Sequence, residues 1–269
     1  DDFYQTDDFR IFPKKQKELW EEGLDKESGK YEGAKWGKYI RAPEIFFKIL
    51  KKGRAKLVPL KDLADVKRGF TTGANEFFYL TEAEILGKGI EKEFWMHRDD
   101  KGNWVPNYVI KSPRECKSII VIPEDLKYRV LMIHKDKKKL KGTNVLKYIK
   151  YGESEGFHKR PTCVSRARWY DLGTWEKPDL VWADAYNDRY GIYDTQKNWA
   201  DKRFFYIYLK KKVHYILIHS YLNSSIIPLI IEIDGITNLG EGAVYTNVYQ
   251  LQRLRIPSNI TKELKRRLS

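Results

Sequence analysis

Two polar segments carry the residues of this sequence that are best suited to contacting a phosphate polymer. The first segment, residues 67–75, reads KRGFTTGAN. Its arginine supplies charge, its glycines would let backbone amides approach a phosphate closely, and its hydroxyl and amide side chains can donate to phosphates or to base edges. A polar turn between two strands is the alternative interpretation. The candidate contact residues of this segment are Lys67, Arg68, Thr71, Thr72 and Asn75.

The second segment, residues 158–170, reads HKRPTCVSRARWY. If residues 162–168 are extended, Arg166 and Arg168 face the same side, because side chains alternate along a strand. Two guanidinium groups would then line one edge, and an arginine can contact O6 and N7 of guanine together. An exposed charged strand, with Trp169 and Tyr170 in the core, is the alternative. The candidate contact residues are His158, Lys159, Arg160, Ser165, Arg166 and Arg168.

A third basic stretch lies between these segments. Residues 127–150 contain nine lysines or arginines and one acidic residue, Asp136. A solvated lysine-rich face and a phosphate-binding face both explain such a run, and the residues alone leave the two open.

Patterns that support catalysis are missing from the sequence. It contains neither NPPY nor DPPY, the loops that hold a target amine in amino-group methyltransferases, and no P-loop or glycine-rich turn suited to a nucleotide or to S-adenosylmethionine. A nuclease of the PD…(D/E)xK kind is the nearest enzyme hypothesis, on Pro178-Asp179. The required spacing does not follow, because Asp194 and Lys197 are three residues apart. These side chains are better suited to salt bridges or turns.

Apolar patterning predicts a mixed α+β fold: a single lobe with a mixed, largely antiparallel sheet and flanking helices. Residues 1–35 are predicted to be a connecting arm, residues 36–258 the binding domain, and residues 259–269 a basic C-terminal helix. The predicted helices cover residues 43–52, 142–151, 213–222 and 225–233, and the predicted strands lie near residues 118–123, 180–183, 190–193 and 204–209, with a last strand ending near Ile256.

Composition agrees with a folded domain that binds an anionic partner. The 269 residues are 42% hydrophobic, and 51 Lys and Arg against 37 Asp and Glu give a net charge of +14. Cys116 and Cys163 lie far apart and outside any CxxC pattern, so neither a disulfide framework nor a zinc site is predicted. No apolar run reaches the about 18 residues of a membrane helix, no signal peptide is visible, and a cytoplasmic location is expected. The missing initiator methionine suggests a piece of a longer chain.

Five motifs in fixed order resemble a known family. They are VKRGFTTGANEFFYL (66–80), IEKEF (90–94), YIKYGESEGFHKRPTCVSRARWYDLG (148–173), YLNSS (221–225) and NLGEGAVYTNVYQLQRLRIPS (238–258). Together they resemble the C-terminal target-recognition domain of N6-adenine DNA methyltransferases of restriction-modification systems, of the type IIG and TaqI-like kind. A looser likeness links them to type I restriction specificity subunits. The resemblance covers about residues 37–258.

This resemblance implies a domain that reads double-stranded DNA beside a methyltransferase domain of the same chain or of a partner subunit. S-adenosylmethionine would bind that other domain of the parent enzyme, and this chain would hold no cofactor or metal and perform no catalysis. The parent would be a site-specific adenine N6-methyltransferase, and whether it also cleaves DNA stays open.

Three other functions compete with DNA recognition. An RNA-binding module is one, because lysine, arginine and aromatic side chains also suit stacked single strands. A self-contained nuclease is the second, on Pro178-Asp179 alone. The third is an interaction scaffold built on the apolar helices of residues 213–233, although packing against a sheet explains those helices more simply.

Overall fold

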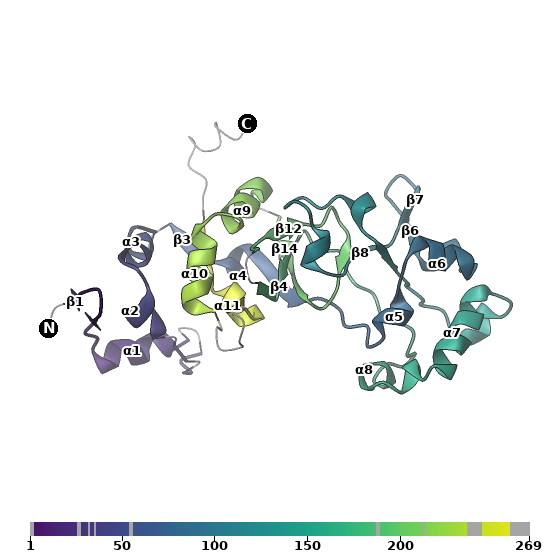
Figure 1. Cartoon of the computed structure of the whole chain (residues 1–269), viewed down its shortest axis with the longest axis horizontal. Helices are drawn as coiled ribbons and strands as arrows, with labels where there is room; N and C mark the ends of the chain where they lie inside the picture. The colour runs from purple at the N-terminus through teal and green to yellow at the C-terminus, as the bar shows by residue number, and fades with distance from the viewer. Residues whose placement is uncertain are drawn as a thin grey trace. The chain divides into compact units, whose positions relative to one another are not determined.

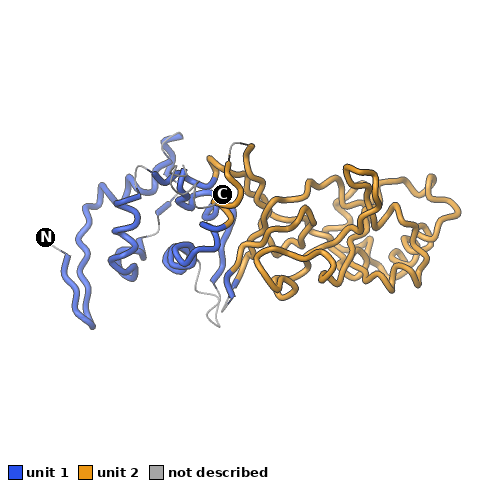
Figure 2. The backbone as a smooth tube through the Cα atoms, turned by 90° about the horizontal axis from the view of Figure 1, so that it is seen from above, with its two compact units in different colours: residues 1–60, 186–190, 220–269 blue, residues 61–185, 191–219 orange. Residues whose placement is uncertain are grey.

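The structure is a computed structural model that describes residues 3–258 except 26–27, 32, 35, 54–55, 187–188, 212 and 236–243. It is mixed α+β with mostly antiparallel strand pairs, as the sequence predicted, although the strands form several sheets rather than one (Figure 1). The chain divides into two compact units. Unit 1 comprises residues 1–60, 186–190 and 220–269, and unit 2 comprises residues 61–185 and 191–219 (Figure 2).

The sequence did not predict this division. The predicted boundaries at residues 35 and 258 stay predictions, and the predicted basic helix at 259–269 lies outside the described residues.

Unit 1 combines short helices with strand pairs from distant parts of the chain. β16 pairs antiparallel with β3, placing Ile256 opposite Val58, and buried Leu251 and Leu254 lie just before it. Four isoleucines of α10 are buried. The elements are β1 (Tyr4–Gln5), β2 (Arg10–Ile11), α1 (Gln16–Gly23), α2 (Gly37–Arg41), α3 (Glu44–Gly53), β3 (Leu57–Pro59), α10 (Ile226–Asp234), β15 (Val244–Tyr245), α11 (Val248–Gln252) and β16 (Arg255–Pro257).

Unit 2 contains two four-stranded sheets, ordered β12-β10-β14-β4 and β13-β8-β9-β5. Every pair is antiparallel except β13 with β8. The strands of these sheets are β4 (Ala64–Arg68), β5 (Tyr79–Leu80), β8 (Tyr108–Ile110), β9 (Tyr128–Val130), β10 (Leu180–Ala183), β12 (Ile192–Asp194), β13 (Trp199–Ala200) and β14 (Phe204–Leu209). A separate antiparallel pair is formed by β6 (Met96–Arg98) and β7 (Trp104–Pro106).

The helices of unit 2 are mostly short. They are α5 (Asn75–Phe78), α6 (Glu82–Gly87), η1 (Lys92–Phe94), η2 (Pro113–Glu115), η3 (Pro123–Asp125), η4 (Lys137–Leu140), α7 (Asn144–Ser154), η5 (Phe157–Lys159) and α8 (Pro161–Val164). Three elements cross between the units along the chain: α4 (Leu60–Leu63), β11 (Ala185–Tyr186) and α9 (Tyr215–Leu222).

An aromatic core in unit 2 packs α5 and α7 against the second sequence segment. The Phe77 ring lies 4.7 Å from the Tyr148 ring and 4.6 Å from the Trp169 ring, centroid to centroid. Gly152 makes this packing feasible, because a Cβ there would lie 2.6 Å from a Trp169 ring atom. Trp169 is buried, as the alternative interpretation of the second segment had it, and the residues around it are anchored to α5 and α7.

Most predicted elements are confirmed with small shifts in their bounds, including α3, α7, α9 and α10. The predicted buried strand at residues 118–123 is wrong. That run forms one isolated bridge, Ile120 to Asp194, and Ile119 and Ile122 are exposed while Val121 is buried. Pro123 then starts η3, and proline lacks the amide that a longer strand pairing would need.

Among the described residues no single helix is long and apolar enough to cross a membrane. Of the helices that the structure describes, one pair, α9 and α10, meets the criteria of length and composition when taken together, with a bend of 57° between them.

Candidate nucleic-acid interface

Lys67 and Arg68 end strand β4 at the surface of unit 2. The pairing with β14 places Arg68 opposite Phe205, and the Arg68 Cζ lies 5.5 Å from the Phe205 ring centroid. Its Nη2 lies 2.9 Å from an Asp184 carboxylate oxygen, yet the Arg68 side chain is 55% exposed. Lys67 Nζ lies 5.5 Å from the Tyr208 ring centroid. Both cations are therefore held over aromatic rings with their charged ends at the surface.

The glycine loop, residues 69–75, follows β4 and is closely packed. The Gly69 amide donates to the Phe204 carbonyl at 2.9 Å, and a Cβ on Gly69 would lie 2.8 Å from the Asp201 carbonyl oxygen. Gly73 has φ +78°, and a Cβ there would lie 2.8 Å from Thr162 Cβ. The expectation that these glycines offer amides to phosphate is wrong for Gly69, whose amide is already bonded inside the fold.

The polar side chains of the glycine loop differ in access. Thr72 is buried, and its hydroxyl hydrogen-bonds to the Asn75 side-chain oxygen and accepts from the Ala74 amide at 3.3 Å. Asn75 begins α5 and is half-buried, as is Thr71. Thr72 and Asn75 thus shape the turn into α5.

The basic turn, residues 158–168, does not form the extended strand on which the alignment of Arg166 and Arg168 depended. Residues 161–164 form α8, and residues 165–170 are turns and bends. Pro161 occupies the first helical turn, where its fixed φ favours a helix start. The expected edge of two parallel guanidinium groups is therefore wrong.

Arg166 instead ties the basic turn to the glycine loop. Its Nη1 donates to the Thr72 carbonyl at 2.8 Å and to the Trp169 carbonyl at 3.2 Å, and its Nη2 donates to the Thr71 carbonyl. Burial lowers the pKa of Arg166. Arg160 adds a second tie, because its Nη2 lies 2.5 Å from a Glu76 carboxylate oxygen. The structure therefore brings together the two segments that the sequence singled out separately.

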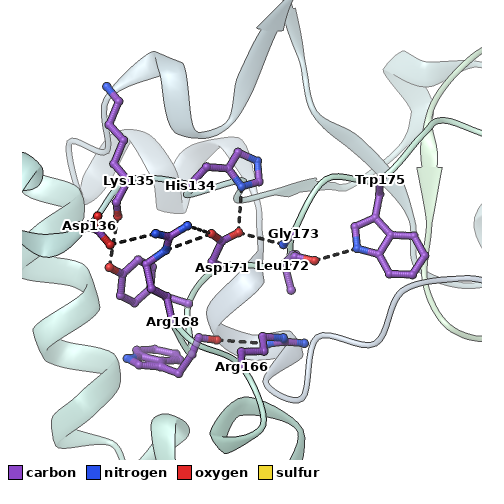
Figure 3. A network of polar contacts seen from close by, with 11 residues as sticks. His134, Lys135, Asp136, Arg166, Arg168, Asp171, Leu172, Gly173 and Trp175 are labelled. Atoms are coloured by element: carbon purple, nitrogen blue, oxygen red, sulfur yellow. Dashed lines mark hydrogen bonds and ion pairs between the residues drawn. The ribbon is translucent and has the colours of Figure 1, made fainter.

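Arg168 belongs to a polar network centred on Asp171 (Figure 3). Its Nε and Nη2 donate to Asp171 Oδ2 at 3.1 and 2.5 Å, and its Nη1 donates to Asp136 at 2.9 Å. Asp171 Oδ1 also lies 2.8 Å from His134 Nδ1 and accepts from the Gly173 amide at 2.8 Å. Burial alone would raise the pKa of Asp171, but these hydrogen bonds lower it overall.

A pocket of about 300 Å³ opens beside this network. It is lined by Arg166, Ala167, Arg168, Asp171, Leu172 and Gly173. Sequence reasoning assigned no role to Asp171, although the residue lies in the motif WYDLG.

The remaining predicted residues lie on the same turn. Lys159 is exposed, and Ser165 is exposed with its hydroxyl donating to the Thr162 carbonyl at 3.0 Å. His158 is half-buried with its ring centroid 6.5 Å from that of Trp169. Its buried Nδ1 has no hydrogen-bond partner among the described residues.

Two exposed cations that sequence reasoning missed adjoin the glycine loop. Lys202 and Arg203 lie in the turn that precedes β14. The residues on either side of them, Asp201 and Phe204, pack against Gly69. Buried Asp201 holds this turn, because it accepts from the Tyr79 hydroxyl at 2.9 Å and from the Arg203 amide at 3.2 Å. The signal available in the sequence for these two cations was the run DKR (201–203) directly before the aromatic strand β14.

The stretch of residues 127–150 is partly neutralised. Lys135 pairs with Glu93 at 3.0 Å and Lys137 pairs with Glu153, while Lys138 and Lys139 lie exposed on η4.

The carboxylates of the nuclease hypothesis serve structural contacts. Asp179 accepts from Lys197 and, at 2.8 Å, from the Leu209 amide, and Asp194 accepts from the amide and the side chain of Gln196. Within the described part of the chain, no group of three or more His, Cys, Asp or Glu side chains is placed to hold a metal ion. The expectation of salt bridges and turns is confirmed.

Fold and composition together define a mixed α+β domain with a strong basic charge, in which most of the candidate residues lie in loops and turns. The comparison with known families is specific. Residues 33–267 match the family described as the C-terminal domain of the type II methyltransferase M.Eco57I, and the chain belongs to this family.

Two relatives place this domain within longer proteins. The chain is 27% identical over 137 residues to the type II methyltransferase M.AccI of Acinetobacter calcoaceticus, which covers 49% of this chain and 23% of that protein. The solved structure of the type IIG restriction endonuclease BpuSI matches this chain with a TM-score of 0.54 and 14% sequence identity. The match covers 83% of this chain and 27% of the BpuSI chain, and it shows a shared fold. The resemblance predicted from the motifs is confirmed, and the chain spans about a quarter of the length of either relative.

Proposed function

We propose that this chain is the sequence-specific DNA-recognition domain of an adenine N6-methyltransferase or a combined restriction-modification enzyme. Catalysis would reside in a methyltransferase domain of the same chain or of a partner subunit. That domain would bind S-adenosylmethionine as the methyl donor, since the 269 residues contain no glycine-rich turn suited to it. The observation that carries the proposal is the joining of the glycine loop to the basic turn beside exposed cations, within a member of this family.

The proposal divides the candidate residues by access. Exposed groups would meet the DNA, and buried groups would hold them in place, because a guanidinium that already serves buried carbonyls cannot turn to a phosphate without leaving them unpaired. Thr72 and Arg166 are holding residues, and Thr71, Asn75 and His158 lie between the two classes. The proposed contacts are the exposed Lys67, Arg68, Lys159 and Ser165, with Lys202 and Arg203 added, and also the half-buried Arg160 and Arg168, whose side chains stay 40% and 35% exposed.

The ion pair of Arg68 does not prevent DNA binding. An exposed pair contributes only about 0–1 kcal/mol to folding, because water and salt screen it. Arg68 uses one Nη on Asp184 and keeps its other donors, so it can exchange a carboxylate for a phosphate at low cost. Contacts to phosphate then fix the domain on the duplex, and any group that reaches a base edge adds sequence selectivity.

Binding to duplex DNA as a function of salt tests the proposal. Log K should fall linearly with log salt, with a slope of about −0.9 for each phosphate neutralised. The double substitution Lys67→Gln and Arg68→Gln should make the slope shallower by up to about 1.8. Lys51→Gln with Lys52→Gln on α3 of unit 1 is the matched control, because it removes the same charge from exposed positions.

Three results would contradict the proposal. A flat salt response at micromolar protein would mean that the charge is only a solvated surface. Equal losses in both double variants would assign binding to net charge rather than to this surface. Stronger competition by single-stranded RNA than by duplex DNA would favour an RNA-binding module.

A further inference from the structure

Exposed apolar side chains concentrate in the N-terminal part of unit 1. Among the described residues, nine of the seventeen exposed large apolar side chains lie between residues 3 and 45. Most single exposed apolar residues need no explanation, but a concentration of this kind marks an interaction surface.

The β1-β2 hairpin places its apolar side chains on two opposite sides. Phe12 faces the helices, with its ring centroid 4.9 Å from Tyr39 and 5.1 Å from Phe47. Arg10 anchors the hairpin by donating to the Ala42 carbonyl at 2.7 Å. Tyr4 and Ile11 are cross-strand partners and therefore lie on the same side of the hairpin. Ile11 directly precedes Phe12 in the chain, so this is the side opposite to Phe12, and Tyr4 and Ile11 are 53% and 44% exposed. Because alternate residues of a strand point to opposite sides, the hairpin turns one apolar side to α2 and α3 and the other to solvent.

An aromatic stack on α1 extends the exposed set. The rings of Trp20 and Tyr31 are stacked with centroids 4.3 Å apart and planes 14° apart, and both are exposed. Gly23 lies against the Tyr31 ring, since a Cβ there would collide with it. The stack is therefore formed within unit 1 itself, so a partner would lose little entropy in using it.

Charge excludes nucleic acid as the natural partner of this surface. Residues 1–45 contain nine Lys and Arg against eleven Asp and Glu, while the whole chain carries +14. The rest of the chain therefore carries +16. An aromatic surface without excess positive charge is typical of a protein interface, whereas DNA contact requires cations.

The position at which the family match begins indicates which part of the parent enzyme covers this surface. The family match begins at residue 33, so Tyr4, Ile11, Trp20 and Tyr31 all precede the matched C-terminal domain. The relatives are about four times longer than the part of them that this chain matches.

We infer that the arm surface, formed by Tyr4, Ile11, Trp20 and Tyr31, docks on the methyltransferase domain of the parent enzyme. The inference rests on the proposed function for the existence of that domain. Docking there would fix unit 1 at a set position relative to the catalytic domain.

Hydroxyl-radical footprinting of side chains tests this inference. The oxidation rates of Tyr4 and Trp20 are compared between this 269-residue chain and the complete parent enzyme. They should fall at least about fivefold in the parent, because side chains in an interface core lose contact with water. Tyr151 on α7 is the matched control, since it is 50% exposed in unit 2, and its rate should stay the same.

A variant makes the result specific. Ile11→Glu in the parent should restore the oxidation rate of Trp20 towards that of the 269-residue chain, whereas Ile119→Glu, equally exposed in unit 2, should not. A photo-crosslinker at position 20 should capture peptides of the methyltransferase domain.

Three outcomes would overturn the inference: unchanged rates for Tyr4 and Trp20 in the parent, crosslinks to another part of the parent, and protection that appears in the 269-residue chain alone as its concentration rises. The last would assign the surface to a second copy. The salt titration on the same samples separates the two proposals, because protection without DNA binding would refute only the recognition function, and DNA binding without protection would refute only the docking.

Discussion

The basic turn and the end of strand β4 use their arginines in opposite ways. Arg166 of the basic turn is half-buried and gives its guanidinium to three backbone carbonyls, two of them in the glycine loop. Arg68 of β4 is 55% exposed, with one ion pair across the surface. Both are arginines in polar motifs of similar composition, so residue type does not separate a residue that holds the loop together from one that we propose contacts DNA. Burial and the number of internal hydrogen bonds separate them.

Arg166→Ala should have the largest effect on stability. It removes a charged donor from three carbonyls, and hydrogen bonds to charged groups contribute about 1.5–3 kcal/mol, so the free energy of unfolding should fall by about 2–4 kcal/mol. Urea denaturation measures it. Arg166→Lys keeps the charge but loses the planar fork, and should recover only part of the loss. If Arg166→Ala left stability unchanged while lowering affinity for DNA, Arg166 would contact DNA and the contrast with Arg68 would be lost.

Gly73→Ala tests whether the glycine loop is locked against α8. Alanine there is strained by the positive φ and by the 2.8 Å approach to Thr162, and the free energy of unfolding should fall by about 2–3 kcal/mol. Gly142→Ala is the control, because Gly142 has φ +85° with nothing within 4 Å of its Cβ position. It should lose only the backbone cost of about 1 kcal/mol. Equal losses would mean that the loop is not packed on α8.

Asp171→Asn tests the polar network that holds Arg168. The substitution removes the charge that Arg168 and His134 share, and should lower the free energy of unfolding by about 1–2 kcal/mol at neutral pH. Because the pKa of Asp171 is lowered in the folded state, its contribution is present above the unfolded pKa of about 3.9 and is lost as pH falls through the folded value. The difference between wild type and variant should therefore shrink as the pH falls below the unfolded pKa and through the lower folded pKa of Asp171. A constant difference over that range would assign the loss to packing.

The sequence predicted the regular elements better than the roles of single side chains. Helix α7 and strand β14 follow from local apolar spacing, which depends only on neighbours in the chain. The apolar run at residues 118–123 was wrongly predicted to be a strand, because apolar spacing does not show whether a neighbouring strand is available for pairing over its whole length. Only Val121 is buried there.

The candidate interface was found in part. Both segments were identified, but their contact through Arg166 and the role of Asp171 required the tertiary structure, since the partners lie far apart in sequence. The burial of Trp169 agrees with the alternative interpretation of the second segment. Lys202 and Arg203 were missed because a short basic turn between strands looks like ordinary solvated charge.

Arg68→Ala should have the smallest effect on stability and thereby complete the contrast with Arg166. An exposed ion pair contributes about 0.2–1 kcal/mol, so the free energy of unfolding should fall by no more than that. Burial raises the pKa of Asp184, while Arg68 and Arg203 oppose the rise. A carboxyl with a raised folded pKa is destabilising when it is ionised, and Arg68 offsets part of this cost. The small loss of stability in Arg68→Ala should therefore be present at about pH 7, and it should vanish as the pH falls through the folded pKa of Asp184. The slope of log K against log salt for duplex DNA should at the same time become shallower by about 0.9. A loss of stability as large as that of Arg166→Ala, without a change in the salt slope, would show that Arg68 is also a structural residue and that the DNA-binding surface lies elsewhere on the domain.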